Sequence, residues 1–107
     1  MVSFGPDLNL HAGARRKSGE LAANRFKVLG DPTRMAFVNR MLHGQVSVTD
    51  LAAYFELSQP TVSAHVKILR DAGLLEAERA GTFTFYRVTE ERLRTFIDEA
   101  LGELTQR

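Results

Sequence analysis

Residues 57–75 read Leu-Ser-Gln-Pro-Thr-Val-Ser-Ala-His-Val-Lys-Ile-Leu-Arg-Asp-Ala-Gly-Leu-Leu, and they predict one helix together with both of its ends. Ser58 can cap the N-terminus of a helix, and Pro60 suits the first turn, where no backbone N–H is needed. Gly73 is a typical residue just beyond a helix. Between them, three apolar residues recur at helical spacing and predict its buried side: Val62, Val66 and Leu69.

A shorter helix is predicted immediately before this one. Ser47-Val48-Thr49-Asp50 resembles a capping box in its acidic variant, with Ser47 as the cap and Asp50 three residues on. Leu51, Ala52 and Phe55 carry its apolar face, and Glu56-Leu57-Ser58 is short enough to be a tight turn. Two short helices joined by about three residues are typical of a helix-turn-helix.

A β-hairpin is predicted after the second helix. Side chains alternate in character over residues 75–79 and again over residues 83–88. The connection Ala80-Gly81-Thr82 is short and contains glycine, which favours a hairpin turn, and we expect no large side chain at its tip. A hairpin that follows a helix-turn-helix is the plan of a winged helix-turn-helix domain.

Three further helices are expected around this unit. The first carries Leu21, Arg25, Val28 and Leu29 and ends at Gly30, and Asp31-Pro32 caps and opens the second, which ends at Gly44. The third runs from Thr89 onward. The predicted fold class is therefore mainly α with a small β-hairpin, with about five helices plus a wing. Residues 1–18 are expected to form a flexible arm, and residues 19–107 the domain.

Composition limits the possible functions. The chain has 107 residues, enough for one domain, and no cysteine, so a disulfide framework, a thiolate metal site and a cysteine redox switch are excluded. No apolar run approaches the roughly 20 residues that span a membrane, and the basic cluster Arg15-Arg16-Lys17 follows the apolar residues of the N-terminus, the wrong order for a secretory signal. We expect a cytoplasmic protein. No phosphate loop or nucleophile–base set is present, so no enzyme activity is predicted.

The exposed face of the second helix-turn-helix helix is the candidate DNA-binding surface. Gln59 can form a bidentate pair with adenine, Ser and Thr can bond base edges or phosphates, and Lys67 and Arg70 suit phosphates. The net charge of only +1 is weak for a nucleic-acid binder, so the hypothesis depends on the motif. The wing should add Arg79 and Arg87, which flank its tip. The expected DNA-binding residues are Gln59, Thr61, Ser63, Ala64, His65, Lys67, Arg70, Arg79 and Arg87.

The chain resembles the ArsR/SmtB regulators. The resemblance lies in residues 26–34 (Phe-Lys-Val-Leu-Gly-Asp-Pro-Thr-Arg), in Asp50-Leu51-Ala52, in residues 57–75 and in Tyr86-Arg87-Val88, and it extends over roughly residues 20–104. It implies a five-helix winged domain, a dimer built from the first and last helices, a palindromic operator on double-stranded DNA, and usually repression that an effector releases.

Two metal sites known in this family are missing. One uses cysteines at the start of the first helix-turn-helix helix, where this chain has Gln45-Val46-Ser47-Val48-Thr49-Asp50. The other uses Asp and His ligands at the start of the last helix and His and Glu near its end. This chain has no histidine in either place and offers Glu90, Glu91, Arg92, Glu103 and Gln106. Of the three histidines, His65 is better used in DNA contact or packing, and His11 and His43 could meet only if the arm folds back. We expect no metal and no cofactor.

The last helix predicts a homodimer, because its apolar stripe is longer than a small winged domain needs for its own core. The expected dimerisation residues are Leu21, Val28, Leu93, Phe96, Ile97, Ala100, Leu101 and Leu104. The stripe could instead pack within its own chain. Two further alternatives remain at this point: a winged-helix module for protein–protein contact without an operator, and a repressor released by a small organic ligand between the dimer helices.

Overall fold

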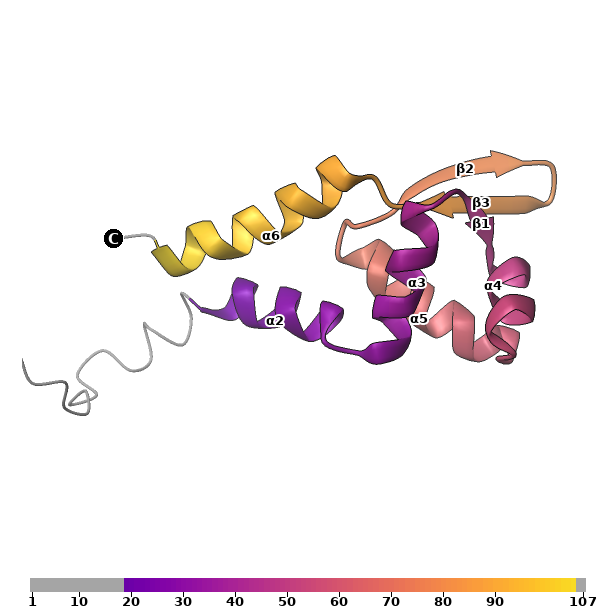
Figure 1. The fold of residues 1–107 in the computed structure, drawn as a ribbon, viewed down its shortest axis with the longest axis horizontal. Coiled ribbons are helices and arrows are strands. Elements are labelled where there is room, and N and C mark those ends of the chain that lie inside the picture. Colours follow the sequence, from indigo (N-terminus) through magenta and orange to yellow (C-terminus); the bar gives the residue numbers. More distant parts are fainter. Residues whose placement is uncertain (1–18, 106–107) are drawn as a thin grey trace, which may run out of the picture.

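The computed structural model describes residues 19–105, which form five helices and three strands (Figure 1). The predicted mainly α fold with a wing is confirmed, whereas the expected arm over residues 1–18 lies outside the described residues. In chain order the elements are α2 (Glu20–Leu29), α3 (Pro32–Leu42), β1 (Val46–Ser47), α4 (Val48–Phe55), α5 (Gln59–Asp71), β2 (Glu76–Ala80), β3 (Phe83–Arg87) and α6 (Glu90–Thr105).

The helix starts follow from side-chain caps. Asp31 accepts a hydrogen bond from the Arg34 backbone N–H at 3.0 Å and opens α3. At α4 the capping box is complete, because Ser47 Oγ accepts from the Asp50 N–H and Asp50 accepts from the Ser47 N–H, each at 3.1 Å. Ser58 Oγ accepts from the backbone of Thr61 at the start of α5. The three predicted caps are therefore confirmed.

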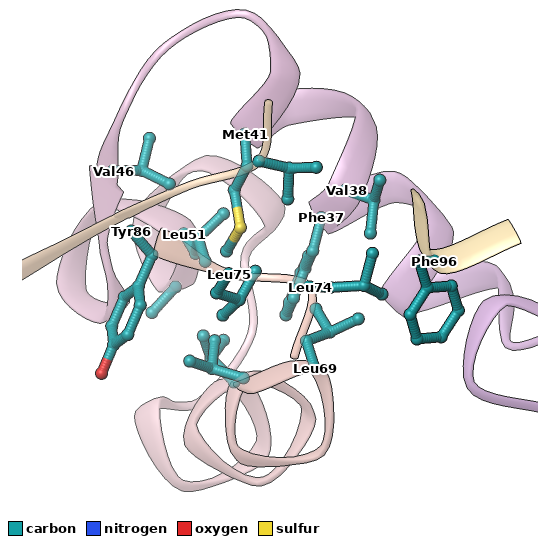
Figure 2. Packing of buried hydrophobic residues seen from close by; sticks show 14 residues of the cluster. Phe37, Val38, Met41, Val46, Leu51, Leu69, Leu74, Leu75, Tyr86 and Phe96 are labelled. Carbon is teal, nitrogen blue, oxygen red and sulfur yellow. The ribbon is translucent and has the colours of Figure 1, made fainter. Parts of the chain in front are cut away.

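One hydrophobic core holds α3, α4 and α5 together. Its largest fully buried side chains are Phe37, Met41, Leu51, Val62, Leu69 and Leu74. Figure 2 labels all of these except Val62. Burial of such side chains contributes roughly 1.5–3 kcal/mol each. Tyr86 of the sheet and Phe96 of α6 join the same cluster. Because Val62, Val66 and Leu69 of α5 all point into this core, the opposite side of α5 must face away from it.

The wing is part of a three-stranded antiparallel sheet with the order β1-β3-β2. The sequence predicted only the β2–β3 hairpin, and β1 was missed because it is two residues long and forms only by pairing Val46 with Tyr86 and Ser47 with Phe85. Ala80 pairs with Phe83, so the turn itself is Gly81-Thr82, and Gly81 has a φ of +63° that suits glycine.

α2 and α6 lie side by side in opposite directions and extend away from the winged body (Figure 1). Arg25 of α2 joins them: its guanidinium donates to the Phe96 carbonyl oxygen at 2.8 Å, lies 2.6 Å from a carboxylate oxygen of Glu99, and stacks 4.5 Å from the centre of the Phe96 ring. Glu103 accepts from the Ala22 N–H at 2.8 Å. Within residues 19–105, no helix combines the length and the apolar character needed to cross a membrane.

Candidate nucleic-acid interface

Most of the predicted DNA-binding residues lie together on the outward face of α5. Burial of Val62, Val66 and Leu69 fixes the rotation of this helix on the core. Ser58 both caps the helix and donates its hydroxyl to Thr61 Oγ1 at 2.8 Å. Six of the predicted residues on this helix are exposed, as expected: Gln59, Thr61, Ser63, Ala64, Lys67 and Arg70.

His65 is the exception on α5, because it turns toward α3 rather than to solvent. Its ring meets the Phe37 ring edge-on with 5.9 Å between the centroids, and Arg34 Nη1 lies 3.3 Å from His65 Nδ1. His65 directly precedes buried Val66 and sits at the edge of the buried stripe. The prediction that it belongs to the exposed face is wrong.

The two cations near the end of α5 share one carboxylate. Lys67 Nζ lies 2.6 Å from Asp71 Oδ2, and Arg70 Nε lies 3.9 Å from Asp71 Oδ1. The hydrogen bond from Lys67 is the main reason why the pKa of Asp71 lies below its usual value. All three side chains are more than half exposed, and ion pairs at such exposed positions contribute little to stability. Both cations can therefore exchange Asp71 for another anion at little cost.

The wing presents one arginine near its tip rather than two. Arg79 is exposed and pairs with Thr84, next to the turn. Arg87 lies at the opposite end of the hairpin, because the antiparallel register places it across from Glu76, and its guanidinium bonds Glu76 at 2.8 Å and 3.0 Å. The prediction that Arg87 flanks the tip is wrong. The turn residues themselves carry no large side chain, but Phe83, the first residue of β3, is half exposed beside them.

The predicted dimerisation stripe is divided between the core and the surface. Phe96 and Ala100 are buried within the chain, which contradicts their assignment to a surface stripe, because α2 covers that side of α6. Val28, Leu93 and Ile97 are partly buried against the core. Leu21, Leu101 and Leu104 remain 40%, 47% and 55% exposed on the α2–α6 pair. Phe26 of α2, which the sequence reasoning did not select, is similarly exposed.

No group of three or more His, Cys, Asp or Glu side chains suited to a metal ion occurs within residues 19–105. Of the histidines that could have joined a site, His43 bonds the Asn39 carbonyl oxygen at 2.7 Å, and His11 lies outside the described residues. The absence of a metal site in the whole chain stays a prediction.

Known proteins resemble this chain in both sequence and fold. Residues 31–77 match the family model for bacterial regulatory proteins of the arsR family. An uncharacterized helix-turn-helix transcriptional regulator of Methanocaldococcus jannaschii is 35% identical over 79 residues, which cover 73% of this chain and 89% of that protein. The transcriptional repressor SdpR of Bacillus subtilis is 32% identical over 79 residues, which cover 74% and 88%.

A solved structure of similar architecture comes from Mycobacterium bovis. It is the homodimeric winged helix-turn-helix DNA-binding domain of a possible ArsR-family transcriptional regulator, and it aligns with a TM-score of 0.65 at 23% identity. The alignment covers 97% of this chain and 94% of that one. At this level of identity the comparison demonstrates the shared fold.

Proposed function

This chain belongs to the ArsR family of bacterial regulatory proteins, and we propose that it is a repressor that binds a palindromic operator as a homodimer. The winged helix-turn-helix makes it a DNA-binding transcription regulator. The observation that carries the proposal is the outward face of α5, where exposed polar side chains are held on a helix that the core fixes in place.

The recognition chemistry follows from the side chains of this face. The major groove, about 12 Å wide, admits a helix, and recognition helices lead with their N-terminal residues. Gln59 would pair with adenine there, with Thr61 and Ser63 bonding base edges or phosphates. Lys67 and Arg70 would exchange Asp71 for phosphates, and Arg79 would reach the backbone beside the wing. Neither His65 nor Arg87 is assigned a DNA contact in this proposal.

The α2–α6 pair would supply the dimer interface. Leu21, Phe26, Leu101 and Leu104 are exposed apolar side chains on these two helices, which supports an interaction site there. Two copies related by a two-fold axis would present two α5 helices to half-sites about 34 Å apart. The remaining predictions fit this proposal: residues 1–18 would form an arm before a domain of residues 19–107, and the protein would work in the cytoplasm, where a bacterial chromosome lies.

The proposal is tested by selecting binding sites from a random duplex library and footprinting the enriched sequence. We expect a symmetric site protected over both halves. Gln59→Ala should lose about 1–3 kcal/mol of discrimination between this site and random DNA. Asn39→Ala, an exposed polar change on α3, is the matched control and should keep it. Arg79→Ala should weaken both kinds of DNA by similar factors, because a phosphate contact carries no sequence information.

Two results would contradict the proposal. A library without an enriched sequence would favour the protein–protein module. Protection of a single asymmetric half-site by one protomer would exclude the palindromic operator and the dimer that binds it.

A further inference from the structure

We propose that Ala64 recognises the 5-methyl group of a thymine at the centre of each half-site. The inference rests on the proposed function and goes beyond it, because it names a base, and one apolar group on that base, for a residue without hydrogen-bonding side-chain atoms.

Ala64 occupies the middle of the outward face of α5. It lies two residues after Val62 and two before Val66, and both valines are buried at 2% exposure or less. With 3.6 residues per turn, a residue two positions from each of them points about 160° away from both. Ala64 is therefore directed almost straight away from the core, and it is exposed. Pro60, four residues earlier, lies on the same side of the helix and is exposed too.

Both polar and apolar side chains border Ala64. Ser63 and Lys67 are exposed polar neighbours, and Lys67 pairs with Asp71. Ile68, one turn later on the same side of the helix, is apolar and 40% exposed. When the helix enters the major groove, its most outward side chain comes closest to the base edges. A methyl group at that position allows the backbone to approach, whereas a long side chain would hold the helix away from the bases.

Only one of the four bases offers an apolar partner in the major groove. Thymine carries the C5-methyl group there, whereas the hydrogen-bonding edges of guanine, cytosine and adenine present donors and acceptors. A polar base edge pressed against Ala64 would lose water without gaining a hydrogen bond, which is unfavourable. Alanine against a thymine methyl buries apolar surface on both sides. Gln59, which suits adenine, favours an A·T-rich half-site for an independent reason.

The test replaces each thymine of the selected site, one at a time, with deoxyuridine, which lacks only the methyl group. The readout is the ratio of the two dissociation constants, thymine site against uracil site, measured for each protein variant. We expect one thymine in each half-site whose replacement weakens wild-type binding about fourfold, the value for one buried methyl-sized group. For Ala64→Gly the ratio at that position should fall to about one.

The ratio separates recognition from folding. Glycine in a helix lowers stability, and this would weaken the binding of both sites equally, so the ratio would not change. Ala64→Ser retains helix-forming ability better than Ala64→Gly, and its ratio of dissociation constants should also fall to about one. Ala53→Gly, at an exposed alanine of α4, makes the same backbone change away from the proposed contact and should keep it.

A symmetric selected site at which no deoxyuridine substitution matters would overturn this inference and leave the proposed function intact. A uracil penalty that persists in both Ala64 variants would assign the methyl contact to another residue and overturn it as well. Failure to enrich any symmetric site would overturn the proposed function and this inference together.

Discussion

Arg34 of α3 contacts both α2 and α5, and we predict that its replacement destabilises the fold more than the replacement of any single exposed charged residue. Its side chain is 11% exposed. Nε donates to the Val28 carbonyl oxygen at 2.9 Å and Nη2 to the Lys27 carbonyl oxygen at 3.1 Å. These carbonyls belong to the last turn of α2, where no later helical N–H can reach them. The third contact of the guanidinium, to His65, ties the same group to α5.

The expected loss of stability follows from these contacts. Arg34→Met keeps much of the side-chain volume but removes every hydrogen bond. A hydrogen bond to a charged group is worth about 1.5–3 kcal/mol, and the lower value applies here because water can reach part of the site. Loss of the two carbonyl contacts should therefore lower the free energy of unfolding by about 3 kcal/mol. For a domain of this size this corresponds to a fall in Tm of about 12–24 °C.

The assay is urea unfolding followed by circular dichroism at one fixed protein concentration, because dimerisation makes apparent stability depend on concentration. Arg94→Met is the matched control: the Arg94 side chain is 73% exposed and bonds Glu90 on the same helix, so its replacement should change the free energy of unfolding very little. An Arg34→Met protein as stable as the control would contradict this prediction, since the carbonyls of α2 would then be satisfied equally well by water.

Three further outcomes are expected. Leu101→Glu with Leu104→Glu should give a folded monomer by light scattering and circular dichroism; a stable dimer would place the interface elsewhere. Lys67→Ala should weaken binding to operator and random DNA alike and flatten the salt slope by about 0.9, whereas an unchanged slope would show that Lys67 makes no phosphate contact. The pKa of Asp31 lies below its ordinary value, chiefly because its carboxylate accepts the Arg34 backbone N–H. The ionised Asp31 carboxylate therefore stabilises the fold above its unfolded pKa of about 4, and this stabilisation is lost as pH falls through the lower folded pKa. Unfolding measurements should show that Asp31→Asn loses less stability than wild type on acidification.

Several features could be predicted from the sequence because the forces behind them act within one turn of helix. The caps at Asp31, Ser47 and Ser58 depend on residues no more than three positions away. The rotation of α5 follows from the spacing of its apolar residues, since that spacing alone decides which side can be buried. The exposed face from Gln59 to Arg70 was therefore predictable with only His65 misplaced, and that residue sits at the boundary of the stripe.

Tertiary structure alone decided what depends on residues far apart in the chain. Strand β1 exists because Val46 pairs with Tyr86, 40 positions later in the chain. The two residues of this strand carry no sequence pattern from which the pairing could be predicted. Arg87 is withdrawn from the wing tip by the register that sets it opposite Glu76. The apolar stripe of α6 is divided because α2 packs on one side of it, burying Phe96 and leaving Leu101 exposed. Periodicity shows that a helix has an apolar side, but only the packed neighbours determine how much of that side the chain itself covers.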